Sequence, residues 1–331
     1  MARHAAPARS RAGRVSVLRR LTGVAAMNTT TVPSTPPHAQ GQGGPAPVRY
    51  PGACDCHVHV FDDGTRYPWD ASRNYTPAAA TLDELLALHA RIGVDRMVIV
   101  QPSPYGTDNR CTVAALERLG DAGRGVAVID ASTSDEDLRA LHAAGVRGVR
   151  VNLETHGRHD PDYAQDCLFW AARRVAPLGW HVQAYTNLQT LSALMRPLAD
   201  LPATLVVDHF GRAQAALGTA QPGFERLCDA MARGRVYVKL SAPYRISQDA
   251  DYADAAAIAR ALIAANPDRV LWGSDWPHPG AAAGKPRPLD EITPFRAEDD
   301  ARAMARALAW AGTPDVARKL LVDNAARLYE F

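Results

Sequence analysis

The sequence lacks any long apolar run, because Asp, Arg, Gly or Pro interrupts every hydrophobic stretch before it approaches the ~18 residues that a membrane-spanning helix requires. This absence excludes an integral membrane protein. The 331 residues are 47% hydrophobic, 22% charged and 7% aromatic, which is the composition of a globular chain with enough apolar material for one large core. Disordered, collagen-like and disulfide-rich classes are therefore excluded as well.

Cysteine is scarce and irregularly placed. The chain has five cysteines, an odd number, and no C-x-x-C pair. A disulfide framework would need an even set of cysteines, and metal or redox sites of the common kinds would need that paired spacing. We therefore expect reduced thiols and a cytoplasmic protein.

Lysine is almost absent, and acidic residues are missing from the first part of the chain. Three lysines occur among the 37 basic residues, and residues 1–54 contain seven Arg but no Asp or Glu. The remainder has 30 basic and 35 acidic residues. A mildly acidic body lacks the broad cationic surface that nucleic-acid binding uses, so we expect no nucleic-acid partner.

Residues 1–46 are predicted to be a disordered leader. From residue 28 onward this segment is rich in Pro, Gly, Thr and Gln, with too few large apolar side chains to order itself by burial. Arg19 and Arg20 precede a short LTGVAA segment that superficially resembles a targeting signal, but its apolar part is too short. We favour Met27 as the start of the protein, with Met1 as the alternative.

From Asp55 onward, short β-branched segments alternate with amphipathic stretches of helical length. This is the pattern of repeated βα units around a parallel sheet. A helix over 81–93 is marked by Thr81 and Glu84 as a capping box and by Gly93 beyond its end. The predicted strands cover residues 54–60, 96–101, 125–130, 146–152, 181–186, 204–209, 236–241 and 269–275.

These eight strands within about 275 residues predict an α/β fold, a (β/α)8 TIM barrel, with residues 47–331 as a single domain. A closing helix is expected near 313–322. The extra segment at 60–80 is predicted to be a long loop at the carboxyl ends of the strands, where such barrels place their functional groups.

Two histidines lie on the first predicted strand, in the segment CDCHVH at 54–59. Because side chains alternate along a strand, we expect Asp55, His57 and His59 to share the face toward the barrel interior, with both cysteines on the other face. Two imidazoles that point into one cavity are more than packing usually leaves there. His57 and His59 are therefore candidate site residues.

The sixth and eighth predicted strands end in further candidates. His209 ends the sixth strand in VDHFGR, where the alternative interpretation is a simple capping turn. Asp275 ends the eighth strand in LWGSDWPHP, and its carboxylate can accept a proton from water as a general base. Gly273, on the same face, leaves space below it for a ligand or another side chain.

Three arginines lie at or just beyond strand ends on the same side of the predicted barrel: Arg150, Arg212 and Arg245. A guanidinium binds a carboxylate through two parallel hydrogen bonds, so we expect these residues to bind an anionic substrate. The alternative is that Arg212 or Arg245 pairs with a loop carboxylate such as Asp249 or Asp208.

The motifs HVH, DHFGR and WGSDWPHP, in this order along the chain, resemble the amidohydrolase superfamily. More closely, the sequence resembles the 2-pyrone-4,6-dicarboxylate lactonase family, through CHVHVF, NYTP, VIVQPSPYGTDN, GVAVID, GVRGVRVN, GWHVQAY, DHFGR, WGSDWPHP and NAARLY. So widely spread a set is specific for the family and less specific for the substrate.

The resemblance implies a hydrolase that opens the ring of a small anionic lactone: 2-pyrone-4,6-dicarboxylate, or a related sugar-acid lactone or muconolactone. In the implied mechanism, Asp275 removes a proton from the attacking water. His209 and Tyr185 polarise the lactone carbonyl, and His57 and His59 orient the water and the carboxylate.

Tyr75 and Ser103 match positions that contact substrate in the family that this chain resembles. One departure concerns substrate binding, because the family pattern has a second Arg where this chain has His156. We include His156 among the substrate-binding candidates, although the loss of a guanidinium weakens the expectation of a planar dicarboxylate. A second departure is Tyr105, which stands where the family has a His in the second-strand loop.

The residues themselves leave the need for a metal open. His57, His59, His209 and Asp275 could bind one Zn²⁺ or Mn²⁺. The further Lys or His that metal-dependent members of the superfamily carry on the fourth or fifth strand is missing, since these strands end in RVN and QAY. The lactonase resemblance implies a metal-independent site, so we favour the absence of a cofactor.

Other functions are compatible with the same residues. One is a metal-dependent decarboxylase of the same superfamily, and another is a lactone isomerase, in which a substrate hydroxyl replaces water. A binding protein without chemistry is disfavoured by the presence of all four residues: His57, His59, His209 and Asp275. The expected binding partner is the small anionic lactone, and we expect no association with a membrane. The protein is expected to be a monomer or a homo-oligomer.

Overall fold

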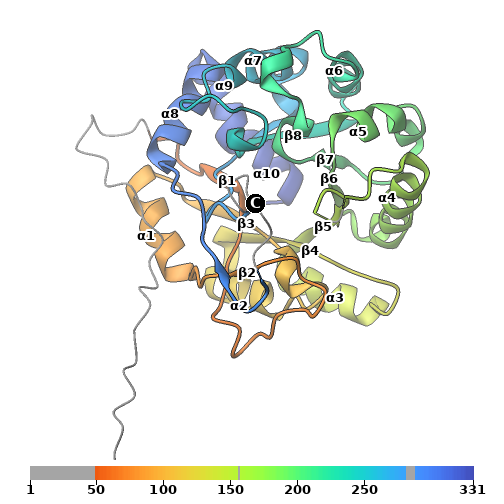
Figure 1. Ribbon diagram of the computed structural model, residues 1–331, viewed down its shortest axis with the longest axis vertical. Coiled ribbons are helices and arrows are strands. Elements are labelled where there is room, and N and C mark those ends of the chain that lie inside the picture. Colours follow the sequence, from red (N-terminus) through yellow and green to blue (C-terminus); the bar gives the residue numbers. More distant parts are fainter. Residues whose placement is uncertain (1–48, 156, 281–287) are drawn as a thin grey trace, which may run out of the picture. The chain divides into compact units, whose positions relative to one another are not determined.

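The computed structural model describes residues 49–155, 157–280 and 288–331. Its central feature is an eight-stranded parallel sheet in chain order, surrounded by helices (Figure 1). The predicted (β/α)8 barrel is therefore confirmed. Its strands are β1 (Cys54–Val58), β3 (Arg96–Val100), β4 (Gly123–Ala127), β5 (Val146–Asn152), β6 (His181–Tyr185), β7 (Leu205–Val207), β8 (Val236–Ser241) and β9 (Val270–Gly273).

Helices cover the outside of the barrel. The first begins and ends as predicted, because the Thr81 N–H donates to the Glu84 carboxylate at 2.7 Å and Gly93 takes a φ of 77°. The closing helix runs further than 313–322, through a π-helical turn at Lys319–Asp323. The helices are α1 (Leu82–Ile92), α2 (Arg110–Leu119), α3 (Asp135–Ala143), α4 (Pro161–Val175), α5 (Leu188–Leu194), α6 (Phe224–Ala232), α7 (Ala255–Ala265), α8 (Asp300–Ala311), α9 (Pro314–Arg318) and α10 (Asn324–Tyr329).

The barrel closes between β1 and the chain that follows β9. The backbone N–H of Asp275 donates to the carbonyl of His57 at 2.9 Å, and the N–H of His59 donates to the carbonyl of Trp276 at 2.8 Å. Backbone hydrogen bonds therefore fix three candidate site residues next to one another before any side chain is considered.

The interior of the barrel changes character along its axis. Its apolar part, which we call the floor, draws residues from six strands: Cys54, Cys56, Val98, Val100, Val126, Val206, Tyr237 and Leu271. Nearer the carboxyl ends of the strands the interior becomes polar, with Gln183 on β6 and Lys239 on β8 fully buried. The outer faces of the strands belong to a larger apolar cluster that includes the helices.

The first strand departs from regular alternation, so the expected grouping of its side chains is wrong in part. Between Asp55 and Val58, β1 carries one residue more than the facing part of β3. This β-bulge places the neighbours Cys56 and His57 both toward the interior. Asp55 points outward instead, and its Oδ2 lies 3.3 Å from Nε2 of His89 on α1.

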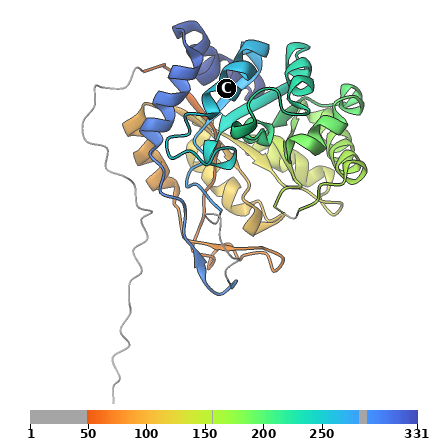
Figure 2. The same ribbon diagram turned by 45° about the horizontal axis from the view of Figure 1, so that its top comes forward.

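The segment at 60–80 lies at the carboxyl ends of the strands, as predicted, but it is not a free loop. It contains the short strand β2 (Thr76–Pro77), which pairs in parallel with β10 (Ile292–Thr293). Figure 2 shows the orange and blue segments that carry these strands side by side at one end of the barrel. The side chains of Arg73 and Thr76 both donate to the carbonyl of Leu289, at 3.2 and 2.5 Å.

The predicted leader at 1–46, with the choice between Met1 and Met27, lies outside the described residues. The single domain at 47–331 stays a prediction. Within the three described ranges, no helix combines the length and the apolar character needed to cross a membrane.

Candidate active site

A cavity of about 370 Å³ opens at the carboxyl ends of the strands, where barrels of this type build their sites. Every predicted substrate-binding residue that the structure describes lines this cavity, whereas His156 lies outside the described residues. The lining includes His59, Asn74, Tyr75, Ser103, Arg150, Glu154, Tyr185, Arg212 and Arg245.

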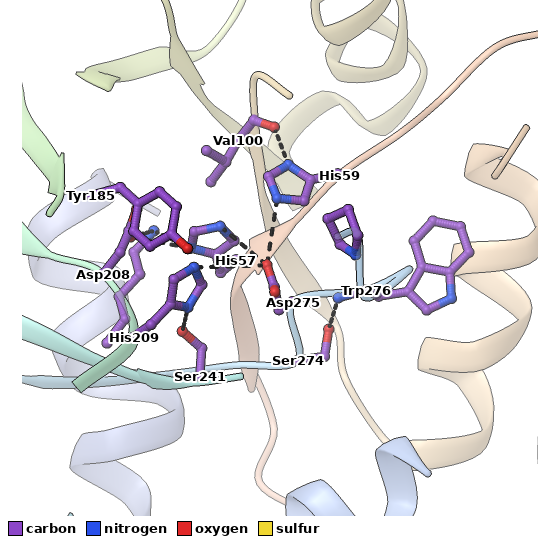
Figure 3. Close-up of polar contacts among 12 residues, drawn as sticks. His57, His59, Val100, Tyr185, Asp208, His209, Ser241, Ser274, Asp275 and Trp276 are labelled. Carbon is purple, nitrogen blue, oxygen red and sulfur yellow. Dashed lines mark hydrogen bonds and ion pairs between the residues drawn. The ribbon is translucent and has the colours of Figure 1, made fainter. Parts of the chain in front are cut away.

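Asp275 lies at the centre of the site, with three imidazoles around it (Figure 3). Its Oδ1 is 3.5 Å from Nε2 of His57, 3.5 Å from Nε2 of His59 and 4.0 Å from Nε2 of His209. All four side chains are buried. The left-handed backbone of Asp275, with a φ of 65°, aims its carboxylate back toward β1. The structure thus brings together the four residues that the sequence singles out.

Two neighbours hold the other oxygen of Asp275. The Tyr244 hydroxyl donates to Oδ2 at 2.5 Å, and the Arg245 guanidinium donates to the same oxygen at 2.8 and 3.2 Å. Burial works to raise the pKa of Asp275, but the charge of Arg245 holds that pKa well below its usual value. Asp275 is therefore an ionised carboxylate, and its Oδ1 is the oxygen that remains available.

The imidazoles of His57, on β1, and of His59, just beyond it, contact other parts of the protein through Nδ1. Nδ1 of His59 lies 2.7 Å from the carbonyl oxygen of Val100, so it must donate, and Nε2 is the nitrogen that faces Asp275. Nδ1 of His57 lies 3.3 Å from Oδ1 of Asp208. Burial lowers the pKa of His57 to about 3, although Asp208 works in the opposite direction, so this imidazole is neutral.

The imidazole of His209 is neutral for the same reason. Burial lowers its pKa well below the usual value, with Asp275 working in the opposite direction. Nδ1 of His209 is 2.8 Å from the Ser241 hydroxyl. Because a hydroxyl can donate to Nδ1, the ring proton can reside on Nε2, facing the other imidazoles.

Each of the three candidate arginines is paired with a carboxylate. Arg150 uses only its Nε for this pairing, and within the described chain its two Nη atoms have no partner. Its guanidinium carbon lies 4.9 Å from the centre of the Tyr185 ring. Arg150 is therefore the arginine most available to an anion in the cavity. The pairs are Arg150 with Asp208, Arg212 with Glu154, and Arg245 with Asp275.

The suggested alternative for Arg212 and Arg245 is thus right about pairing but wrong about the partners. Neither residue pairs with Asp249, and Asp208 is held by Arg150 instead. The reason is spatial, because the carboxylates that reach these guanidiniums come from the ends of other strands.

Two tyrosines offer hydroxyl protons to the cavity. Arg245 donates from Nη1 to the Tyr185 hydroxyl oxygen at 3.2 Å. Since a guanidinium only donates, the Tyr185 proton stays free for another acceptor. Burial raises the pKa of Tyr75, whose hydroxyl lies beside Ser103, so this phenol also keeps its proton.

Several residues of the site were not predicted from the sequence, among them Lys239, Tyr244 and Glu154. Lys239 is fully buried, and its position at an inward step of the apolar strand VYVKLS was the available signal. Tyr244 directly precedes Arg245 and could have been considered with it. Glu154 carried no signal that separates it from an ordinary loop carboxylate.

The donor atoms around Asp275 fit a divalent metal ion. His57 Nε2, His209 Nε2 and Asp275 Oδ1 are buried and, among the described residues, have no hydrogen-bond partner. Together with His59 Nε2 they form a nitrogen and oxygen donor set that suits Zn²⁺ or Mn²⁺. A metal held by these residues would supply Lewis-acid chemistry and lower the pKa of a bound water.

The comparisons with known proteins agree with this architecture. The chain matches the amidohydrolase family model over residues 54–331, so the protein belongs to the amidohydrolase family. A 2-pyrone-4,6-dicarboxylate hydrolase from Comamonas testosteroni is 38% identical, over 84% of this chain and 90% of its own length. A 4-sulfomuconolactone hydrolase from Hydrogenophaga intermedia is 32% identical, over 86% of this chain and 91% of its own length.

Among solved structures, a protein of Pseudomonas putida is similar to this chain with a TM-score of 0.72 and 32% identity. The match covers 84% of this chain and 97% of that protein, which is provisionally described as a 2-pyrone-4,6-dicarboxylic acid hydrolase. The resemblance that the sequence motifs indicated is thereby confirmed.

Proposed function

We propose that this protein hydrolyses a carboxylated lactone by attack of water on the lactone carbonyl. The observation that carries the proposal is the ionised Asp275, whose free oxygen faces three buried imidazoles beside an arginine-lined cavity. The names of the two relatives, which specify a pyrone dicarboxylate and a sulfomuconolactone, support the same substrate class.

In the proposed reaction, the Oδ1 atom of Asp275 takes a proton from water while the water oxygen bonds to the lactone carbonyl carbon. His59, whose ring is fixed by the bond from Nδ1 to the Val100 carbonyl, orients the same water through Nε2. The bond from the carbonyl carbon to the ring oxygen then breaks, and the ring oxygen takes the proton back from Asp275. Water is consumed, and the product carries one new carboxyl group and one new hydroxyl group.

The negative charge that develops on the carbonyl oxygen needs donors. His209, with its proton on Nε2, and Tyr185, with its free hydroxyl proton, are the two groups that we assign to this role. Loss of one such donor typically costs about 10²-fold or more in kcat. His57 is assigned a similar role to His59: its Nε2, 3.5 Å from Oδ1 of Asp275, accepts a hydrogen bond from the attacking water.

The anionic group of the substrate is assigned to Arg150, since this guanidinium has both Nη atoms free within the described chain. Arg212 shares its charge with Glu154, so a second carboxylate must compete with that residue. Tyr75 and Ser103 also line this cavity. We therefore propose a lactone with at least one carboxylate, such as 2-pyrone-4,6-dicarboxylate, a muconolactone or a sugar-acid lactone.

We further propose that the reaction runs without a metal. The Arg245 guanidinium is bonded to Asp275, and the ammonium of Lys239 lies 3.5 Å from Nδ1 of His57. These buried positive charges oppose the addition of a divalent cation to the same donor atoms. We propose a cytoplasmic setting as well, because all five cysteines are free, and a monomer or a homo-oligomer as the working form.

The first experiment is a direct assay. The full chain, treated with a chelator, is mixed with 2-pyrone-4,6-dicarboxylate, and loss of the pyrone ultraviolet absorbance is followed. We expect hydrolysis without added metal, and unchanged hydrolysis by Asp166→Asn, a matched change of an exposed residue on α4.

Activity that appears only after Zn²⁺ or Mn²⁺ is restored would leave the lactonase proposal standing and show the metal-free proposal to be wrong. Failure to hydrolyse this pyrone, a muconolactone and a sugar-acid lactone, with or without metal, would refute the proposed function.

A further inference from the structure

Lys239 is a buried charge that the proposed reaction does not use. It lies on the inward face of β8, between the apolar floor and the candidate active site, with no exposed surface. Its Nζ lies 2.6 Å from the side-chain oxygen of Gln183 and 4.0 Å from a carboxylate oxygen of Asp208, surroundings that suit a charged ammonium. A fully buried lysine is costly, so its contacts are informative.

The ammonium fixes the orientation of an amide. Nζ of Lys239 lies 2.6 Å from Oε1 of Gln183, and since an ammonium only donates, that atom must be the amide oxygen. The NH₂ group of Gln183 is thereby turned toward Asp208, to whose Oδ2 it donates at 3.1 Å. Reversal of the amide would place an NH₂ group against the ammonium and an oxygen against the carboxylate.

Asp208 in turn fixes the proton of an imidazole. Its pKa is well below the usual value, because the opposing charges around it outweigh its burial, so it is an acceptor at both oxygens. Arg150 and Gln183 donate to Oδ2. Oδ1 has no hydrogen-bond partner among the described residues and faces Nδ1 of His57 at 3.3 Å, while Nζ of Lys239 is 4.0 Å from Oδ1 and 3.5 Å from Nδ1. A proton on Nδ1 gives the buried Oδ1 a donor, whereas an unprotonated Nδ1 that accepted from Lys239 would leave this oxygen without one. The satisfied arrangement therefore has the His57 proton on Nδ1 and an unprotonated Nε2 facing Asp275.

We propose that Lys239 is a positioning residue: through Gln183 and Asp208 it holds His57 in the tautomer whose Nε2 accepts a hydrogen bond from the attacking water. We refer to these residues as the relay. Its ends are a donor-only ammonium and an imidazole, and the bonds from Lys239 through Gln183 to Asp208 have one allowed direction. The part of the inference that concerns water rests on the proposed lactone hydrolysis, whereas the tautomer of His57 does not.

Two variants distinguish the relay from the alternative that Lys239 only supplies a buried positive charge. Lys239→Met removes the ammonium and keeps most of the side-chain length. Gln183→Glu keeps an acceptor for Lys239 but cannot donate to Asp208, so it breaks the relay at the next bond. Lys319→Met is the matched control, because Lys319 is a partly exposed lysine that pairs with Asp268.

The decisive measurement is the ¹⁵N NMR spectrum of the histidine rings in the free enzyme, with the His57 signals identified by their loss in His57→Gln. We expect a single Nδ1–H tautomer in the wild type and in Lys319→Met, and a mixture or the opposite tautomer in Lys239→Met and Gln183→Glu. With a lactone that the wild type hydrolyses, kcat of both variants should fall about tenfold or more, while KM stays within about threefold.

An Nε2–H tautomer of His57 in the wild type would overturn the proposal, and so would an unchanged tautomer in both relay variants. If Lys239→Met fails to fold, Gln183→Glu decides the question alone. If the wild type hydrolyses no lactone, the proposed function fails, and the NMR measurement still tests the relay.

Discussion

Asp275→Asn is the substitution that tests the proposed chemistry most directly. Asn retains the shape of the side chain and is among the residues that best tolerate the left-handed backbone seen here, a φ of 65°, so the turn after β9 should keep its conformation. What changes is basicity, because a neutral amide cannot take a proton from water. General-base assistance is worth about 10² to 10⁴-fold, and we expect kcat to fall on that scale.

The same change should strengthen binding of the anionic substrate. In the wild type, Asp275 neutralises the Arg245 guanidinium at 2.8 Å. Coulomb's law gives an attraction of about 3 kcal/mol between a guanidinium and a substrate anion about 5 Å apart, at an effective dielectric constant of about 20. Without the carboxylate charge of Asp275, Arg245 attracts an anion in the cavity more strongly. After part of this attraction is spent on desolvation, we expect the Kd to decrease by about tenfold.

Single-turnover kinetics give the rate, and calorimetric titration of the unreactive variant with intact lactone gives the Kd. The wild type provides a second check, since Asp275 has a pKa well below its usual value and His57 and His209 are neutral. Its kcat should therefore show no acid limb near neutral pH. Comparable turnover in Asp275→Asn, or a Kd that rises tenfold or so, would refute the assigned role of this carboxylate.

Three other changes have definite expected outcomes. Glu154→Gln frees Arg212 and should lower KM for a dianionic lactone by about fivefold, which is the scale of a partly exposed ion pair, while kcat stays unchanged. An unchanged KM in steady-state kinetics would contradict the proposal that Glu154 competes with the substrate for Arg212. Gly273→Ala places a Cβ 2.8 Å from Cβ of His57, so the free energy of unfolding should fall by about 3 kcal/mol in denaturant titrations, and unchanged stability would argue against this close approach. Burial lowers the pKa of His181 from 6.5 to about 3, so this residue contributes about 2 kcal/mol to the folding free energy that is lost between neutral pH and pH 5, as the unfolded chain takes up a proton. His57 and His209 contribute in the same way, so His181→Leu should reduce the total loss by about 2 kcal/mol. A loss as large as that of the wild type would exclude a contribution from His181.

The fold and the centre of the site could be predicted because local rules determine them. Alternating apolar strands and capped helices define the barrel, and all strand ends of a parallel barrel meet at one mouth. His209 and Asp275 follow their strands directly, so their convergence on His57 and His59 required no knowledge of loop geometry.

What could not be predicted depends on contacts between distant segments. Arg212 meets Glu154 because the turn after β7 passes the end of β5, a geometry that no local pattern encodes. Lys239 could be placed on an inward face by alternation, but its partner on β6 lies across the interior of the barrel, and only the packed structure shows that it meets an amide. The β-bulge also escaped prediction, since CDCHVH alternates regularly as a sequence.

That bulge has a consequence for anyone who wishes to transplant the site. A regular strand that carried the same six residues into another barrel would turn Asp55 inward with His57, and would push Cys56 out among the helices. The acquired carboxylate would then lie among the groups that should surround Asp275 alone. A graft must therefore copy the backbone irregularity of β1 along with its side chains, because one additional residue lets a five-residue strand serve both the apolar floor and the polar mouth.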